Sequence, residues 1–251
     1  MDKYGSLLEA LRKYSPIVFL GGAGVSTESG IPDFRSESGI YQTVKEYGYP
    51  PETILSAPFF YDETETFYNY YKKYLIHEHA QPNRAHRALA RLEKAGKLSG
   101  VVTQNIDNLH QAAGSVKVLE LHGSVYRNYC TKCEKFFPLR YIVEHEGVPR
   151  CDACGGIIKP DVVLYGESLD EVVLRGSVAR IAGAEMLIVG GTSLAVYPAA
   201  GLIHYFSGKA MAIINKSSTP ADAQADIVIH DSIGKVLGDA VDALLGPEPQ
   251  E

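Results

Sequence analysis

Short apolar runs alternate along this chain with amphipathic stretches, and this alternation restricts the fold more than any other feature. The apolar runs cover residues 17–20, 100–103, 116–121, 162–164, 186–189, 210–214 and 227–229. Helical spacing of apolar residues marks the stretches 6–13, 64–74, 85–95, 169–181, 198–206 and 233–245. Strands without a polar face, separated by helices, are typical of a parallel sheet covered on both sides. We therefore expect an α/β fold that binds its ligands at the carboxyl ends of the strands.

The four cysteines form two Cys-x-x-Cys pairs, one at Cys130 and Cys133 and the other at Cys151 and Cys154. The 17 residues between the pairs (134–150) fall within the spacing of a zinc ribbon. Four thiolates complete a tetrahedral shell and leave no position for water. We therefore expect one structural Zn²⁺, whose binding folds the short module 126–159. Two disulfides, a redox-active pair and an iron–sulfur cluster are the alternative interpretations.

The overall composition is that of a globular protein, with 45% apolar and 22% charged residues, and the formal net charge is −6. An acidic chain is a poor candidate for holding a phosphate backbone, so we expect no direct nucleic-acid role. No apolar run approaches the roughly 18 residues that span a bilayer, and Asp2 and Glu9 interrupt the N-terminal segment where a signal peptide would be apolar. We expect a cytoplasmic protein with no membrane role.

Two of the apolar runs end in glycines. Residues 21–24 read Gly-Gly-Ala-Gly after the first run, and Gly190 and Gly191 follow a later one. Glycine lets the backbone approach a pyrophosphate and offers N–H groups at the start of a helix. The usual dinucleotide fingerprint has a third glycine where this chain has Thr27, so an ordinary dehydrogenase loop is not expected. A plain tight turn is the alternative, but two glycine ends on one sheet favour a ligand with two phosphates.

Polar side chains follow other apolar runs. Residues 103–107 read Thr-Gln-Asn-Ile-Asp directly after one run, and His122 precedes a glycine after the next. In an α/β fold such strand ends carry the chemistry, which makes His122 a candidate general base. Asp107 is alternatively a helix N-cap, and His122 a structural residue. Residues 30–35 (Gly-Ile-Pro-Asp-Phe-Arg) indicate a loop that is either a lid over the site or a solvated surface turn.

In this order, the segments resemble the sirtuins, the NAD-dependent protein deacylases, of the bacterial and archaeal type. The matching segments are residues 22–26, 30–35, 103–107 and 122–123, the four cysteines, residues 166–167 and 191–193, and Asn215. Each segment alone is weakly specific, whereas the ordered set, over about residues 5–245, is highly specific. The resemblance implies a Rossmann-like domain over residues 1–35, 98–125 and 160–251. The small domain would comprise a helical segment (36–97) and an inserted zinc ribbon (126–159).

The resemblance also implies that NAD lies across the carboxyl edge of the sheet as a co-substrate. The residues that match the family's NAD contacts are Gly22, Ala23, Gly24, Thr27, Phe34, Arg35, Gln104, Ile106, Asp107, Gly191, Thr192, Ser193, Asn215 and Ile233. Asp107 would accept the carboxamide N–H of nicotinamide, beside Ile106. Asn105 would position a water or the ribose, and Phe34 would shield the reacting face from water.

The family's reaction begins when the amide oxygen of an acyl-lysine attacks C1′ of the ribose as the bond to nicotinamide breaks. His122 would then remove a proton from a ribose hydroxyl. The implied products are deacylated lysine, nicotinamide and an O-acyl-ADP-ribose. Val163, Tyr165, Gly166 and Glu167 match the segment that receives acylated lysines of proteins or peptides as an added strand.

Three positions depart from the family pattern. Gly21 replaces the usual Thr, and Tyr165 replaces the usual Phe, which adds a hydroxyl near the expected acyl tunnel. Members that remove acidic acyl groups carry a Tyr with an Arg three residues later, whereas here Tyr71 follows Tyr68. Because a buried carboxylate would lack a cation, we expect neutral acyl groups. Ordinary helix packing is the alternative role for the tyrosines of residues 61–74.

Two other functions share these motifs. A mono-ADP-ribosyltransferase would use the same NAD site and is the second enzyme hypothesis. The third hypothesis is a binding module on a catalytically inactive scaffold, with a basic face on the zinc ribbon formed by Lys132, Lys135, Arg140 and Arg150. The reaction products distinguish the first two functions, and the effect of removing His122 distinguishes the third.

Overall fold

The computed structural model describes residues 3–32 and 37–248, and its centre is a six-stranded sheet in the order β3-β2-β1-β7-β8-β9. The strands are β1 (Ile17–Gly21), β2 (Leu98–Thr103), β3 (Val118–Glu120), β7 (Met186–Gly190), β8 (Ala210–Ile214) and β9 (Ile227–Ile229). Every neighbouring pair is parallel, which confirms the predicted α/β class. The strand order reverses between β1 and β7, and ligands bind at such a reversal in open parallel sheets.

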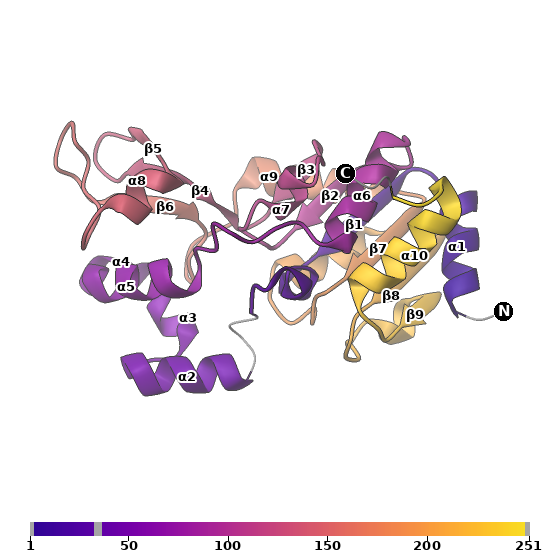
Figure 1. The fold of residues 1–251 in the computed structure, drawn as a ribbon, viewed down its shortest axis with the longest axis horizontal. Helices are drawn as coiled ribbons and strands as arrows, with labels where there is room; N and C mark the ends of the chain where they lie inside the picture. The colour runs from indigo at the N-terminus through magenta and orange to yellow at the C-terminus, as the bar shows by residue number, and fades with distance from the viewer. Residues whose placement is uncertain (1–2, 33–36, 249–251) are drawn as a thin grey trace.

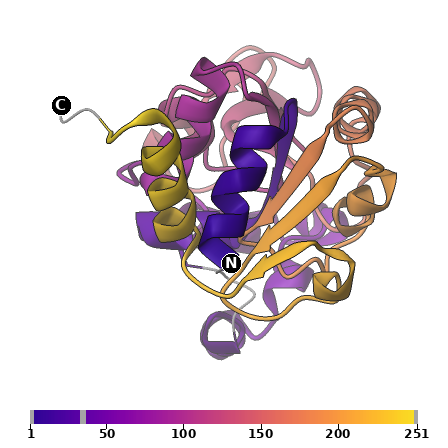
Figure 2. The ribbon, with the colours of Figure 1, turned by 90° about the vertical axis from the view of Figure 1, so that its right-hand side faces the viewer.

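Helices cover both faces of this sheet. They are α1 (Lys3–Lys13), α6 (Arg84–Lys94), α9 (Glu171–Ala182), α10 (Ile233–Leu245) and the 3₁₀ helix η3 (Ala199–Tyr205). Phe19 and Ile188 point to the face covered by α1, α6 and α10, whereas Leu20 and Val189 point to the face covered by α9 and η3. Figure 2 shows α1 (indigo) and α10 (yellow) together on one side of the strands. Because both faces are buried, the strands carry apolar residues at nearly every position.

A small module lies beside the large sheet, at the left of Figure 1. It contains an antiparallel sheet in the order β5-β4-β6, formed by β4 (Gly123–Cys130), β5 (Phe136–Pro138) and β6 (Ile158–Val162). Its helices are α2 (Glu37–Tyr47), α3 (Pro51–Ile54), α4 (Ala57–Asp62), α5 (Thr64–Tyr74) and α8 (Leu139–Glu144). Phe60, Tyr68 and Ile158 belong to a hydrophobic core that is separate from the two cores of the large sheet.

Short elements connect these parts near the strand ends. They are η1 (Ala23–Val25), η2 (Thr27–Ser29), α7 (Leu109–Ala112) and η4 (Asp222–Gln224). Within the described residues, none of the helices combines the length and the apolar composition needed to cross a membrane.

The structure corrects three sequence predictions. The apolar run 162–164 adds no strand to the parallel sheet, because β6 ends at Val162 and belongs to the antiparallel sheet. The helix expected over residues 198–206 is a 3₁₀ helix. Helix α6 falls within the range 36–97 assigned to the small domain, yet Ala88 and Leu89 pack into the core of the large sheet. An apolar stripe indicates that a helix is buried but not which core it joins.

Candidate active site

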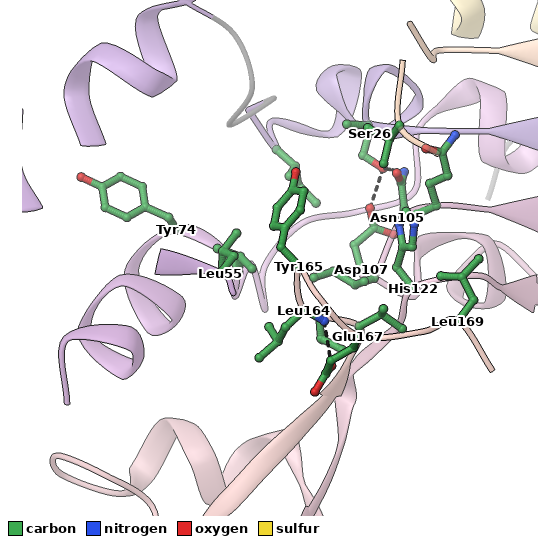
Figure 3. A pocket seen from close by; sticks show the side chains of 18 of the residues that line it. Ser26, Leu55, Tyr74, Asn105, Asp107, His122, Leu164, Tyr165, Glu167 and Leu169 are labelled. Carbon is green, nitrogen blue, oxygen red and sulfur yellow. Dashed lines mark hydrogen bonds between the residues drawn. The ribbon is translucent and has the colours of Figure 1, made fainter. Parts of the chain in front are cut away.

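A cavity of about 220 Å³ lies between the carboxyl edge of the large sheet and the small module (Figure 3). The predicted site residues that line it are Ala23, Gln104, Asn105, Ile106, Asp107, His122, Val163, Tyr165, Gly166 and Glu167. Polar groups gather at one end of the cavity, where Asn105, Asp107 and His122 stand close together. Tyr74 lies at the other end, and its hydroxyl donates to Glu46 at 2.5 Å, outside the cavity lining. That end therefore presents the apolar face of the ring.

The two glycine loops pack directly against each other. The N–H of Gly24 donates to the carbonyl of Gly191 at 2.8 Å. A Cβ atom on Gly24 would lie 2.8 Å from the Gly191 Cα, and one on Gly191 would lie 2.4 Å from the Val25 nitrogen. Gly191 also has φ +58°, a left-handed conformation that favours glycine. Contact between the loops therefore requires both glycines before any ligand is considered.

Gln104 links three of the strand ends. Its backbone N–H donates to the carbonyl of Gly21, and its side-chain amide donates to the Thr192 hydroxyl at 3.1 Å. Its carbonyl oxygen lies 2.9 Å from Nδ1 of His122. A carbonyl only accepts, so Nδ1 carries the proton and the neutral ring is basic at Nε2. Gln104 thus holds His122 in the tautomer that a general base requires.

Asp107 belongs to a hydrogen-bonded group of three side chains. The Ser26 hydroxyl donates to Oδ2 of Asp107 at 2.6 Å, and Nδ2 of Asn105 donates to the Ser26 oxygen at 3.0 Å. The backbone N–H of Leu109 donates to Oδ1 at 3.0 Å, although the N-cap residue of α7 is Asn108 and not Asp107, as the capping alternative had it. Burial raises the pKa of Asp107 above its ordinary value, and the bond from Ser26 offsets part of this shift.

The segment expected to receive the substrate is held at several points along its backbone. The N–H of Val163 donates to the carbonyl of His122 at 3.0 Å. Tyr165 exchanges two backbone hydrogen bonds with the segment 55–57, at 2.9 and 3.0 Å. Oε2 of Glu167 accepts from the Leu164 N–H at 2.9 Å and from Lys159 at 3.0 Å. This fixed segment connects the carboxyl edge of the large sheet to the small module.

Several predicted site residues stand outside the cavity. Phe34 and Arg35 lie outside the described residues. Of the described ones, those that do not line the cavity are Gly22, Gly24, Thr27, Gly191, Thr192, Ser193, Asn215 and Ile233. Thr27 bonds to the carbonyl of Gly24, and Asn215 bonds to the carbonyl of Ser217. The residues of this set lie mainly around the glycine loops and the ends of β7 and β8, outside the cavity.

Two tyrosines of α5, Tyr68 and Tyr71, are core residues. Tyr68 and Tyr71 are fully buried, and neither lines the cavity. The Tyr68 hydroxyl donates to the carbonyl of Ile158, and the Tyr71 ring stacks on Phe67 at 5.5 Å. Ordinary helix packing, the alternative considered for this stretch, therefore describes both residues.

Sequence reasoning gave no role to some residues that line the cavity. They include Ser26, Leu55, Tyr74, Leu75, His77, Leu169, Val196 and Tyr197. Ser26 lies within the matching segment 22–26, so its position directly after the glycine loop could have identified it as a site residue. The others come from helices and loops that only the tertiary fold brings to the site.

The four cysteines converge at one end of the small module. Their Sγ atoms all lie within 4.8 Å of one another, and three of the distances are 3.4, 3.6 and 3.4 Å. Tetrahedral zinc with Zn–S bonds of about 2.3 Å requires sulfur atoms roughly 3.8 Å apart. All four thiols are free. The donor set and its spacing fit a structural Zn²⁺ held by Cys130, Cys133, Cys151 and Cys154.

Comparisons with known proteins agree with this geometry. The Sir2 family profile matches residues 22–198. An NAD-dependent protein deacetylase of Clostridium tetani is 57% identical over 245 residues, which cover 97% of this chain and 99% of that protein. One from Staphylococcus aureus (strain Mu50 / ATCC 700699) is 44% identical over 221 residues, covering 88% and 90%.

Solved structures give the same result. A Sir2 variant with a deacetylated p53 peptide and 3′-O-acetyl-ADP-ribose superposes with a TM-score of 0.89 at 39% identity, covering 98% of this chain and 100% of that one. A complex of a Sir2 homologue with NAD has a TM-score of 0.87 at 36% identity, covering 97% and 94%. With matches over most of its length in both sequence and structure, the chain belongs to the Sir2 family, the sirtuins.

Proposed function

We infer that this chain is an NAD-dependent protein lysine deacylase that yields deacylated lysine, nicotinamide and O-acyl-ADP-ribose. The observation that carries the inference is one cavity in which Asn105, Asp107 and His122 face the segment 163–167. Relatives at 57% identity are NAD-dependent protein deacetylases. Sir2 structures of the same fold contain NAD, acetyl-ADP-ribose, or acetylated and propionylated peptides.

The residues around the strand reversal fit NAD as a co-substrate. The two glycine loops, with Thr192 and Ser193 beside them, would receive the pyrophosphate at the carboxyl ends of β1 and β7. The donors would be groups other than the N–H of Gly24 and of Gly191, which already donate to the carbonyls of Gly191 and Ile214. Asn215 follows β8 and Ile233 begins α10, where they would contact the adenosine half. When bound, NAD supplies an electrophilic ribose carbon and a neutral leaving group, so no acid is required to release nicotinamide.

Asp107 is suited to holding the nicotinamide carboxamide. Each of its oxygens already accepts one hydrogen bond, from Ser26 and from Leu109, and each retains a lone pair for a further donor. Those two bonds also fix the carboxylate in place. Asn105, bonded to the same Ser26 hydroxyl, would orient a water or the ribose beside it.

His122 would remove the proton from the ribose hydroxyl. Its Nδ1–H is held by the carbonyl of Gln104, which leaves Nε2 as the atom that accepts a proton. Its own carbonyl binds the N–H of Val163, so the base and the substrate segment are joined directly. Val163, Tyr165, Gly166 and Glu167 would receive the acyl-lysine peptide. Main-chain pairing with it would use groups of this segment other than those that already bond to His122 and to the segment 55–57, and such pairing places little restriction on the peptide sequence.

The charges around the cavity favour neutral acyl groups. Its lining includes the carboxylates of Asp107 and Glu167, of which Glu167 is already paired with Lys159, and the described part of that lining contains no Lys or Arg. A succinyl carboxylate buried beside these groups would be unpaired, which is costly. The hydroxyl of Tyr165 would lie near the acyl chain and add a polar contact to it.

The cysteines and the net charge bear on the location of the enzyme and on its partners. The four cysteines form no disulfide and are suited to a reducing compartment, which supports a cytoplasmic location. The net charge of −6 supports a role without direct nucleic-acid binding.

The test is to incubate the protein with an acetyl-lysine peptide, with and without NAD, and to follow the products by mass spectrometry. We expect deacetylated peptide, nicotinamide and O-acetyl-ADP-ribose in equal amounts, and only when NAD is present. Replacing His122 by Ala should lower turnover by roughly 10²–10⁴-fold. Transfer of ADP-ribose to protein without deacetylation would instead support the transferase hypothesis and overturn this one.

A further inference from the structure

Arg127 stands where the chain passes from the large sheet into the zinc module. Strand β4 pairs with β6 at Gly123 and Ser124, and pairs again from Asn128 onward, with a shift of register between. Residues 125–127 bulge out of the ladder at this shift. Bulges change the direction of a strand and redirect its side chains, and they are frequent beside active sites.

The guanidinium of Arg127 joins both sheets. Nη1 lies 2.7 Å from Oε2 of Glu120 in β3, and Nε lies 2.7 Å from Oδ2 of Asp161 in β6. The Glu120 side chain is only 10% exposed, and its second oxygen accepts from Gln111 at 2.8 Å. The Glu120 half of this bridge is therefore shielded from solvent, whereas Asp161 is 41% exposed.

The two carboxylates have matching positions relative to the active site. Glu120 lies two residues before His122, and Asp161 lies two residues before Val163. His122 and Val163 are themselves joined by the 3.0 Å backbone hydrogen bond. Arg127 therefore holds together the segment that leads to His122, the proposed base, and the segment that leads to Val163, where the proposed substrate segment begins.

We propose that Arg127 is a positioning residue that sets where His122 stands relative to Val163, and hence relative to the bound acyl-lysine. The inference rests on the proposed function. Arg127 does not line the cavity, so it acts through the two segments and not on the substrate. Only arginine can hold two carboxylates from different strands with one rigid fork, since lysine offers a single point charge.

The primary test replaces Arg127 by Gln in the full chain. We expect kcat for deacetylation to fall about 10- to 100-fold, the range that a misplaced catalytic group produces. The dissociation constant for NAD and the rate of nicotinamide release in the first turnover, measured by rapid quench, should stay at wild-type values, because His122 acts after that release. Arg127→Lys should restore part of the lost kcat.

The control is Arg140→Gln in the same module. Among the residues that the structure describes, Arg140 pairs with Glu144 alone, at 2.6 Å within α8, and its side chain is 82% exposed. This variant should keep wild-type kcat. Should Arg127→Gln fail to fold, Asp161→Asn removes the exposed half of the bridge and should lower kcat in the same direction.

Two results would overturn the proposal. The first is wild-type kcat in a folded Arg127→Gln protein. The second is a loss of NAD affinity and of first-turnover nicotinamide release as large as the loss of kcat, which would mean general damage to the fold. Absence of NAD-dependent deacetylation in the wild-type protein would instead contradict the proposed function itself.

Discussion

The ring of Phe19 occupies the space beside Gly21 that any side chain at that position would need. A Cβ atom on Gly21 would lie 2.4 Å from Cε1 of Phe19, and the same ring would lie 3.0 Å from a Cβ on Gly190. Phe19 is fully buried in the core between the large sheet and α1, α6 and α10. The departure of Gly21 from the family's usual Thr therefore has a local explanation in a large residue two positions earlier.

We expect Gly21→Thr to destabilise the protein by about 1–3 kcal/mol, the usual cost of overpacking a core. Urea unfolding of Gly21→Thr, Phe19→Leu and the double variant tests the cause. The double variant should be more stable than the sum of the two single effects implies, because Leu at position 19 leaves space for the Thr side chain at position 21. Gly176→Ala is the control, since its Cβ would meet Leu119 no closer than 3.6 Å. Strict additivity would contradict the steric explanation.

Acid should destabilise the protein through a buried pair of histidines. The rings of His86 and His110 lie 4.7 Å apart and are almost fully buried, and Nε2 of His86 and both nitrogens of His110 have no hydrogen-bond partner within the described part of the chain. Burial, aided by the charge of Arg87, lowers the pKa of His86 to about 4. Burial also holds the pKa of His110 well below its ordinary value.

The unfolded chain binds protons at these histidines near pH 6.5, whereas the folded chain does not. These neutral histidines therefore leave the free energy of unfolding at its full value above about pH 6.5. As the pH drops toward 4, the free energy of unfolding decreases, by roughly 3 kcal/mol for His86 alone. His86→Asn keeps an acceptor for the Asn83 N–H and should make this pH dependence shallower. The control variant His79→Asn, at an exposed histidine, should leave this pH dependence unchanged. Equal slopes for the wild type and His86→Asn, in urea unfolding at a series of pH values, would contradict this explanation.

Metal analysis should find one zinc per chain. The four thiols hold the turns that close the β4–β6 ladder, in which Cys130 pairs with Ile158. Chelation, or Cys151→Ala, should lower the melting temperature and disorder the small module, because zinc supplies much of its folding energy. Gly156→Ala should weaken zinc binding, since its Cβ would lie 2.8 Å from the Cys130 sulfur. A metal-free chain with unchanged melting would refute a structural zinc.

Acyl preference follows from the charge of the cavity. We expect kcat/KM for succinyl-lysine peptides to be at least about 100-fold below that for acetyl-lysine, equivalent to roughly 3 kcal/mol of unpaired carboxylate. Tyr71→Arg should not create succinyl activity, because Tyr71 is fully buried and does not line the cavity. Comparable kcat/KM values on the two wild-type substrates would show that a cation reaches the acyl end.

The parallel sheet was predictable because strands buried on both faces leave uninterrupted apolar runs, and α10 matches its predicted range 233–245. The cysteine spacing likewise predicted the metal site. Helices α2 to α4 lie within the helical segment (36–97) that the resemblance implies, but the apolar spacing did not delimit them one by one, and α3 and α4 are only 4 and 6 residues long. Strand β4 was missed because its bulge interrupts the alternation of side chains.

The site residues likewise include some that the sequence could predict and some that it could not. Groups at strand ends, such as Asp107 and His122, were predictable because parallel topology brings strand ends to one edge. Leu55 and Tyr74 reach the cavity only through packing of the small module, which local sequence does not record. The link from Arg127 to Glu120 and Asp161 depends on a shift of register, so it is visible only in three dimensions.

The most direct measurement is a crystal structure of His122→Ala with NAD and an acetyl-lysine peptide. We expect the dinucleotide across the carboxyl ends of β1, β7 and β8, nicotinamide beside Asp107, and the acetyl-lysine along the segment from Val163 to Glu167. Either ligand bound elsewhere, or a closed cavity with both ligands present in excess, would contradict an NAD-dependent deacylase built on this edge of the sheet.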